Sequence, residues 1–274
     1  MRVSFIQPRP ELRQCIESLW VFESAVGMPP SDMSMAAPNG CPKLVIPYEN
    51  SLVSTAGGRS RVSREQGLYF VGNRDTSTVI HSTAQKTGFI VIEFAPQGAY
   101  PVFGVPMSEA ANGLFDADVV FGHWGRDTRE SLSNLEMAGQ KLDFIQNQLV
   151  GRLRKGPAEN GVVDYCIKSL RVSDGQIAIK ELERQTGYSR RYLDLLFEKY
   201  VGLSPKALAR IFRFHKFYRK WARGQSYEVL KQEFEDYYYD QAHFTREFKR
   251  MTGYSPREYT RQVSNEFGRR ITVK

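Results

Sequence analysis

Two sets of mostly polar side chains stand near the end of the chain, and the second set repeats the first after 51 residues. Their members pair in order, as Arg190 with Gln241, Arg191 with Ala242, Asp194 with Thr245 and Leu195 with Arg246. Arginine, glutamine and aspartate side chains carry the hydrogen-bond donors and acceptors that distinguish base pairs in the major groove of DNA. The chemistry that these residue types could perform is therefore the reading of base edges.

The segments around both sets have the pattern of a helix that follows a tight turn. Ser189 and Asp240 belong to the residue types that cap helices, and each directly precedes its polar set. Gly187 ends a short helical segment just before Ser189. Apolar residues then recur at helical steps, namely Leu193, Leu196 and Phe197 in the first segment and Phe244 and Phe248 in the second. The sequence predicts two helix-turn-helix motifs, whose second helices would enter the major groove with their N-terminal ends first.

A short phrase closes both motifs. "FEKYVGLSP" begins at Phe197 and "FKRMTGYSP" begins at Phe248, and the two phrases share their Phe, Gly, Ser and Pro. Between the motifs, "KALARIFRFHKFYRKWARG" has the apolar period of one amphipathic helix that begins near Lys206. A stiff helix of this kind could place both reading helices on one face of DNA, in major-groove windows about 34 Å apart. The phrase is therefore repeated because the module is repeated.

Further side chains around the two polar sets are expected to hold the sugar-phosphate backbone. Lys206 and Lys249 are basic, and His243 lies near the start of the second reading helix, in a structural or phosphate-contacting role. The full set of residues predicted to contact DNA is Ser189, Arg190, Arg191, Asp194, Leu195, Lys206, Gln241, Ala242, His243, Thr245, Arg246 and Lys249.

The net charge of +8 is confined to the half of the chain that contains the motifs. Residues 1–155 contain 15 Lys and Arg against 15 Asp and Glu, whereas residues 156–274 contain 23 against 15. This asymmetry indicates that the second half meets a polyanion, although a solvated basic surface would give the same count. "GRLRKGPAENG", from Gly151 to Gly161, has the composition of a linker. We expect two domains, residues 1–155 and residues 156–274.

The first half is rich in short β-strand patterns between Leu44 and Ala95. The runs "KLVIPY", "LYFVG", "STVIH" and "GFIVIEFAP" are separated by turn formers such as "AGG" and "GNRD". They predict a small antiparallel barrel or sandwich, followed by an irregular loop in "FAPQGAYPVFGVP". The predicted fold class is α+β, with a β-rich domain that ends in a helix and an all-helical domain after it.

An apolar stripe precedes the linker. Asp127 and Glu130 resemble a capping box at the start of a helix. The stripe then recurs at helical steps, through Leu132, Leu135, Leu142, Ile145 and Leu149. It could dock on the β-rich domain of the same chain, or it could pair two chains into a homodimer.

The second half resembles the DNA-binding domain of the AraC/XylS family of transcriptional regulators. The resemblance rests on "IKELERQTGYSRRYLDLLFEKYVGLSPKALARIFRF" and on "YYDQAHFTREFKRMTGYSPREY", and it spans about Gly161 to Gln262. "NGCPKLVIPY", "YFVGNRD" and "VIEFAPQGAYPVFGVP" more weakly resemble the sensor half of a subgroup whose ligand is often unassigned. The resemblance implies a bacterial, cytoplasmic regulator, usually an activator, with promoter DNA, RNA polymerase and a small-molecule effector as partners.

The chain departs from the family pattern at both motifs. Glu183 stands where a small residue is usual in the first motif, and Tyr237 stands where glycine is expected in the second. The segment before Tyr237 is also acidic, with Glu228, Glu233, Glu235 and Asp236, and acidic side chains repel phosphate. We therefore expect the first motif to be the principal reader of bases.

Other kinds of chemistry find little support in the sequence. The four histidines have no Cys or His partner at metal-ligand spacing, so no metal or cofactor site is predicted. No phosphate-binding glycine loop or hydrolase motif occurs, and no catalytic residue is assigned. Three cysteines without close pairing fit a reduced, cytosolic protein, with no signal peptide and no membrane span. Two alternatives stay open, namely a DNA-acting enzyme of the methylated-base repair type, which would need a reactive cysteine, and an interaction protein with a degenerate DNA-binding domain.

Overall fold

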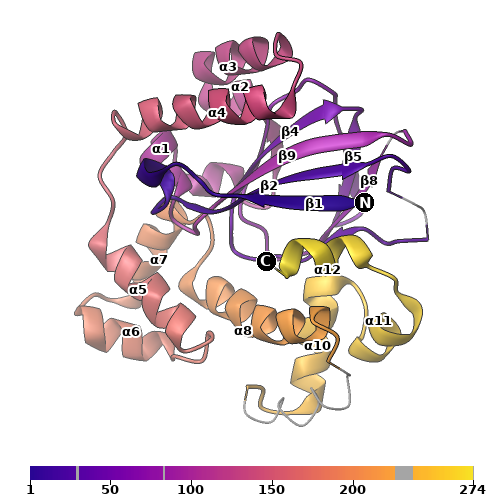
Figure 1. The fold of residues 1–274 in the computed structure, drawn as a ribbon. Helices are drawn as coiled ribbons and strands as arrows, with labels where there is room; N and C mark the ends of the chain where they lie inside the picture. Colours follow the sequence, from indigo (N-terminus) through magenta and orange to yellow (C-terminus); the bar gives the residue numbers. More distant parts are fainter. Residues whose placement is uncertain (29–30, 83, 226–236, 274) are drawn as a thin grey trace.

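The computed structural model describes residues 1–28, 31–82, 84–225 and 237–273. Its first part contains two antiparallel sheets packed face to face, and its second part is helical (Figure 1). The α+β fold class predicted from the sequence is therefore confirmed. The larger sheet has the strand order β1-β2-β9-β4-β7-β10 and the smaller sheet has the order β3-β8-β5-β6.

The ten strands of the described ranges alternate in direction within both sheets. Their bounds are β1 Arg2–Ile6, β2 Ile16–Ser24, β3 Met35–Ala36, β4 Lys43–Glu49, β5 Leu52–Ala56, β6 Arg59–Ser63, β7 Tyr69–Val71, β8 Thr78–Ser82, β9 Thr87–Phe94 and β10 Leu114–Asp116. All eight residues of β9 are buried, because this strand lies between β2 and β4 and is covered on both faces. The runs predicted as strands between Leu44 and Ala95 correspond to β4, β7, β8 and β9.

Two helical features of the first part differ from the sequence-based prediction. The segment predicted as an irregular loop contains the short helix α1, Ala99–Phe103. Pro101 fits there because the first turn of a helix has no intrahelical partner for its N–H groups, and Gly104 ends the helix in the left-handed conformation with φ 70°. The predicted capping box at Asp127 is also wrong, because Gly122 interrupts the chain after α2 (Ala117–Phe121) and α3 (His123–Ser133) begins four residues before Asp127.

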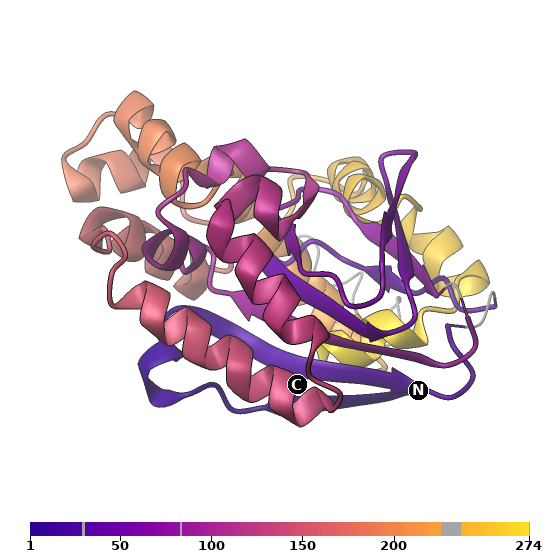
Figure 2. The same ribbon diagram turned by 90° about the horizontal axis from the view of Figure 1, so that it is seen from above.

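The apolar stripe predicted over residues 132–149 is divided between two helices, α3 and α4 (Ala138–Leu153), that pack on the larger sheet (Figure 2). Leu135 lies in the connection between them and is half-buried, so the helical period does not run through it. Leu132, Ile145 and Leu149 are buried in the same core cluster as the strand residues Leu44 and Ile92. Lys141 lies among them and donates from Nζ to the carbonyl oxygen of Leu132 at 2.5 Å. The stripe is therefore intramolecular core, and the interpretation that it pairs two chains is wrong.

The second part consists of helices. Their bounds are α5 Gly161–Val172, α6 Ile179–Thr186, α7 Arg190–Tyr200, α8 Pro205–Ala222, α10 Gln241–Thr252, α11 Pro256–Gln262 and α12 Glu266–Thr272. Two 3-10 turns, η1 Pro10–Leu12 and η2 Met107–Ala110, complete the described elements. The helices α5 to α7 gather at one end of α8, and α10 and α11 gather at its other end (Figure 1). The described part of the chain contains no helix that is both long and apolar enough to cross a membrane.

The repeated phrase has the same structural role at both places. Gly202 and Gly253 adopt left-handed backbone conformations, with φ of 78° and 86°, at the end of a reading helix. The serine two residues later then caps the next helix, since Ser204 Oγ accepts from Ala207 N and Ser255 Oγ accepts from Glu258 N. The proline that follows each serine occupies the first helical position, where its missing N–H costs nothing. The phrase is a helix stop followed directly by a helix start.

The last helix returns to the β-rich part. Phe267 of α12 is fully buried in a cluster with Trp20, Phe22 and Phe89, and its ring meets that of Phe22 edge-on at 5.6 Å. The apolar interior of α5 to α11 forms a separate cluster, which Met35 of β3 joins. The predicted division into residues 1–155 and residues 156–274 stays a prediction.

Candidate nucleic-acid interface

The first reading helix is α7, and it begins where the sequence predicts. Ser189 caps the helix by accepting a hydrogen bond from Tyr192 N at 3.4 Å. Leu193, Leu196 and Phe197 face the core, which leaves Arg190, Arg191 and Leu195 exposed on the opposite face. Arg190 Nε lies 3.8 Å from Asp194 Oδ2, so these two side chains hold each other along the helix surface. Among the described residues Arg191 has no such partner, and its side chain is exposed.

Glu183 has a structural role that the sequence did not reveal. Its carboxylate Oε1 accepts a hydrogen bond from the backbone N of Arg190 at 2.7 Å. The side chain thus reaches from α6 across the turn to the first N–H of α7, which has no partner within the helix. The departure from the small residue usual in the family therefore adds a second cap to the reading helix, and its negative charge is favourable at a helix N-terminus.

The second reading helix is α10. Asp240 caps it, with Oδ1 accepting from His243 N at 2.6 Å. Gln241, Ala242, Arg246 and Lys249 are exposed. Two other residues that are predicted to contact DNA, His243 and Thr245, are only partly exposed.

Thr245 uses its hydroxyl within α10, donating from Oγ1 to the carbonyl oxygen of Gln241 at 2.8 Å. His243 is half-buried, with its ring 5.5 Å from that of Tyr238. The arrangement suits the structural role for His243 rather than the reading of bases.

The helix α8 separates the two reading helices. Lys206 is exposed at the start of α8, close in sequence to the end of α7. The 18 residues of α8 make a rod about 27 Å long, which approaches the spacing of about 34 Å between major-groove windows. Figure 2 shows the two groups of helices at opposite ends of the molecule. The structure thus separates the two polar sets without a flexible joint in α8.

Part of the second motif lies outside the described residues. This part includes the acidic side chains Glu228, Glu233, Glu235 and Asp236, so the effect predicted for them stays a prediction. Tyr237 is described, and its ring lies 4.3 Å from Lys216 Nζ of α8. Lys216 Nζ also lies 2.6 Å from Asp174 Oδ2. Tyr237 is therefore packed against a basic side chain of α8 that is itself fixed by an ion pair.

Two exposed tyrosines extend the repeat and were missed by the sequence reasoning. Tyr188 and Tyr239 each directly precede the cap of a reading helix, and they are also 51 residues apart. Tyr188 is 42% exposed, with its ring centroid 4.8 Å from that of Tyr192, while Tyr239 is 95% exposed. Both side chains are therefore accessible to solvent next to the cap of a candidate reading helix. Extending the comparison of the two motifs by one residue would have found them.

An acidic side chain from the β-rich part sits at the second motif. Asp75, which follows β7, forms ion pairs with Arg250 of α10 and with Arg210 of α8, the latter at 3.9 Å. Arg210 also lies 3.5 Å from Glu247 of α10. Arg250 is exposed on the last turn of α10, so Asp75 would compete with a phosphate for this cation when α10 contacts DNA.

Removing this competition should strengthen DNA binding. Asp75→Asn is expected to raise the affinity for DNA by up to about fivefold, since partly exposed ion pairs are worth about 0–1 kcal/mol. The dependence of log K on log salt should steepen by about 0.9 if Arg250 then binds one phosphate. Both quantities can be measured by fluorescence anisotropy over a salt series. Asp143→Asn, which makes the same charge change on α4 away from the motifs, is the control, and equal effects of the two variants would show that only net charge matters.

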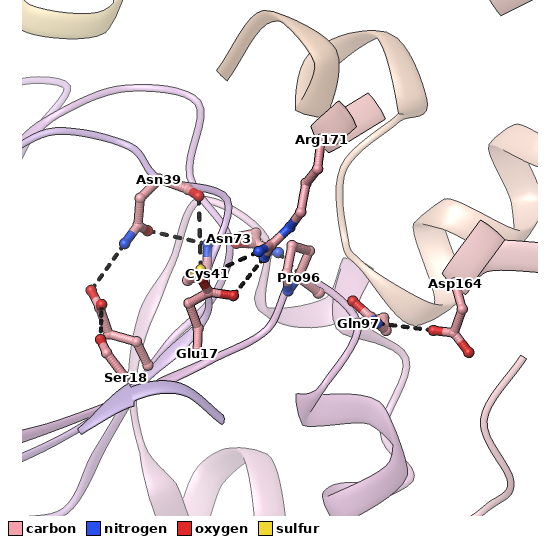
Figure 3. A network of polar contacts seen from close by, with 10 residues as sticks. Glu17, Ser18, Asn39, Cys41, Asn73, Pro96, Gln97, Asp164 and Arg171 are labelled. Carbon is pink, nitrogen blue, oxygen red and sulfur yellow. Dashed lines mark hydrogen bonds and ion pairs between the residues drawn. The ribbon is translucent and has the colours of Figure 1, made fainter. Parts of the chain in front are cut away.

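Other polar contacts join the helical part to the β-rich part (Figure 3). Arg171 of α5 pairs with Glu17 of β2 at 2.6 Å, and Gln97 donates to Asp164 of α5 at 2.9 Å. Burial raises the pKa of Asp164, while its hydrogen bond from Gln97 opposes that change. Together with the ion pair of Asp75 and Arg250, these contacts tie α5 and α10 to the same β-rich scaffold.

The cysteines do not provide the nucleophile that the enzyme alternative needs. Cys15, Cys41 and Cys166 are all buried. Burial raises the pKa of Cys41 to about 12 and the pKa values of Cys15 and Cys166 to about 11. A thiol with such a pKa is almost wholly protonated at neutral pH, and the thiolate is the reactive form. Within the described ranges, no group of three or more His, Cys, Asp or Glu side chains is placed to hold a metal ion.

Comparisons with known proteins agree with the geometry of the two motifs. Residues 4–116 match a domain of unknown function (DUF6597), and residues 182–262 match a helix-turn-helix domain. The F1 operon positive regulatory protein of Yersinia pestis is 32% identical over 100 residues, which make up 36% of this chain. These residues cover 32% of that relative, so the chain spans about a third of the length of the curated relative that it matches.

Solved structures match at low sequence identity. ToxT of Vibrio cholerae is 12% identical with a TM-score of 0.49, over 91% of this chain and 100% of that chain. ToxT with a bound unsaturated fatty acid is 11% identical with a TM-score of 0.45, over 89% of this chain and 96% of that chain. The AraC-like transcriptional activator CuxR is 14% identical with a TM-score of 0.27, over 82% and 88%. From the helix-turn-helix match, the regulatory relative and the two capped reading helices, we conclude that residues 182–262 form a helix-turn-helix domain of the AraC type.

Proposed function

We propose that the chain is a sequence-specific, DNA-binding regulator of transcription, in which α7 and α10 enter the major groove of a promoter. The observation that carries this proposal is the repeat of a capped helix with an exposed polar face, at both ends of one stiff helix. The base-reading residues are Arg191 and Arg246 above all, and the phosphate contacts include Lys206 and Lys249. Activation through RNA polymerase in the cytoplasm is the mode of action that we propose.

Selection from genomic DNA tests this function. Purified protein should enrich a small number of genomic fragments that share a sequence, and the enriched fragments should bind with about 10³-fold or greater preference over unrelated DNA. Fragments without a common sequence would contradict the proposal and would favour a degenerate DNA-binding domain. A homodimer on such sites would have to form through a surface other than the buried stripe of α3 and α4.

The β-rich part supplies the signal in this proposal. A cavity of ≈ 90 Å³ lies between the two sheets, and its walls are mainly apolar, including Trp20, Phe89 and Val91. Arg74 also lines the cavity, and its Nε is buried with no hydrogen-bond acceptor among the described residues. Burial lowers the pKa of Arg74, and an acceptor on a ligand would replace the hydrogen bond that this nitrogen lacks.

The effector class follows from this lining. An apolar cavity of about 150 Å³ is enough to hold benzene, so the cavity suits a molecule of that size or smaller. We assign to it a small, mainly apolar effector that carries one hydrogen-bond acceptor or anionic group.

A further inference from the structure

The C-terminal helix α12 contacts both the β-rich part and the helical part of the molecule. On one side, Phe267 and Ile271 form part of the wall of the cavity between the sheets. Phe267 also packs against Trp20 and Phe89, which line the same cavity, with ring centroids 6.4 and 6.5 Å away. A ligand in the cavity would therefore touch α12 directly.

On its other side, α12 is tied to the helices that carry the second motif. Asn265, which caps α12, is 2% exposed, and its Nδ2 lies 3.1 Å from Tyr218 Oη of α8 and 2.8 Å from Tyr259 Oη of α11. The two hydroxyl oxygens are themselves 3.2 Å apart. Nδ2 also lies 3.0 Å from the carbonyl oxygen of Met35, so three acceptors share its two protons. Asn265 is thus the junction of β3, α8, α11 and α12.

Hydrogen bonds also attach the start of α12 to the β-rich part. Asn265 Oδ1 accepts from Met35 N at 2.8 Å, so one side chain exchanges two hydrogen bonds with the backbone of β3. Asp32, also buried, accepts from the backbone N of Glu266 at 2.6 Å and of Phe267 at 3.3 Å. The start of α12 is therefore held by buried polar groups, and a shift of the helix must carry Asn265 with it.

The second reading helix rests on the groups that Asn265 contacts. Phe248 of α10 packs against Tyr259 with ring centroids 5.5 Å apart, and against Phe214 of α8 at 5.7 Å. Tyr218 stacks on Phe214 at 5.3 Å. The positions of Tyr218 and Tyr259 therefore determine the surface against which α10 packs.

We propose that α12 transmits the state of the cavity to the second helix-turn-helix motif, through Phe267 and Ile271 on the cavity side and through Asn265, Tyr218 and Tyr259 on the DNA-binding side. A ligand that pushes on Phe267 moves α12, and Asn265 passes the movement to α8 and α11 and so to α10. The inference rests on the proposed function, since it gives the route by which the effector would alter DNA binding. It also assigns the control to the second motif, because the hydrogen bonds of Asn265 reach α11, which directly follows α10, as well as α8 and β3.

A double-mutant cycle in the full chain tests the route without a known ligand. Ser63→Leu would place apolar volume in the cavity, since Ser63 is a buried part of its wall. Tyr218→Phe with Tyr259→Phe would remove the two hydroxyls from Asn265 while its bonds to Met35 remain. We expect Ser63→Leu to change the affinity for the selected DNA by about fivefold or more. The same substitution should have less than about a twofold effect in the double phenylalanine background.

The control variants distinguish coupling between the cavity and the DNA-binding helices from a general loss of folding. Tyr165→Phe removes an exposed hydroxyl on α5 that bonds Gln185, and it should leave the effect of Ser63→Leu unchanged. Circular dichroism and thermal unfolding check that each variant is folded, and Ser54→Leu, at another position of the cavity wall, replaces Ser63→Leu if that variant does not fold. Equal effects of the filling substitution in both backgrounds would overturn the proposal.

Hydrogen exchange provides a second measurement that needs no filling substitution. Coupling is reciprocal, so binding of the selected DNA should change the exchange of the backbone amides of residues 266–272. The change should vanish in the double phenylalanine variant, although residues 241–252 still respond to DNA. If DNA binds and the amides of α12 do not respond in the wild type, the inference fails and the proposed function stands. If no genomic fragment is selected at all, the proposed function itself fails.

Discussion

Arg191→Ala is expected to lower the affinity for the preferred DNA site by about 1–3 kcal/mol and to relax discrimination at one base pair. Arg191 is exposed on the first turn of α7, and among the described residues it has no ion-pair partner. Its guanidinium can therefore form the two parallel hydrogen bonds that arginine makes with guanine. Fluorescence anisotropy on the selected site and on all single-base variants of it measures both effects.

Two further variants separate base reading from charge. Arg191→Lys keeps the positive charge but loses the planar fork, so it should retain binding to unrelated DNA and still lose discrimination. Lys206→Ala should weaken binding to all sequences alike and reduce the salt slope by about 1. A loss for Arg191→Ala that is equal on every sequence would mean that Arg191 contacts only phosphate.

Ile145→Ala is expected to lower the free energy of unfolding by about 2–5 kcal/mol, because it leaves a cavity in a fully buried position. Ile145 packs from α4 onto the core of the larger sheet. Urea unfolding followed by circular dichroism measures the change. Val119→Ala, at an apolar position of α2 that is 70% exposed, is the matched control and should change stability by less than about 0.5 kcal/mol.

The same pair of variants checks the intramolecular position of the stripe. If the stripe joined two chains, Ile145→Ala would leave the unfolding of a monomer unchanged and would instead weaken association in sedimentation experiments. The burial of Leu132, Ile145 and Leu149 within one chain leads us to expect the loss of stability.

Features that depend on neighbouring residues could be predicted from the sequence. The caps Ser189 and Asp240 and the stop at Gly187 follow from local rules, because a cap bonds to N–H groups two or three residues away. The strand runs between Leu44 and Ala95 were also recognisable from β-rich composition and turn residues. The apolar stripe predicted helices, but a helical period does not say which surface the helix meets.

Contacts between distant residues could not be predicted. Asp75 and Arg250 are 175 positions apart, and Asn265 and Met35 are 230 positions apart, so no local pattern links them. Glu183 was read as a departure from the family pattern, since its bond to Arg190 N becomes visible only when the angle between α6 and α7 is known. The candidate DNA residues were placed by the motif, while their restraint by the β-rich part emerged only from the fold.

The return of the last helix to the first sheet affects how the chain is made. Phe267 completes an aromatic cluster whose other members, Trp20, Phe22 and Phe89, are synthesised long before it. During synthesis the β-rich part therefore has an apolar surface uncovered until α12 has left the ribosome, and such surfaces promote aggregation. We expect nascent chains that end before Phe267 to bind chaperones more strongly than chains that include α12.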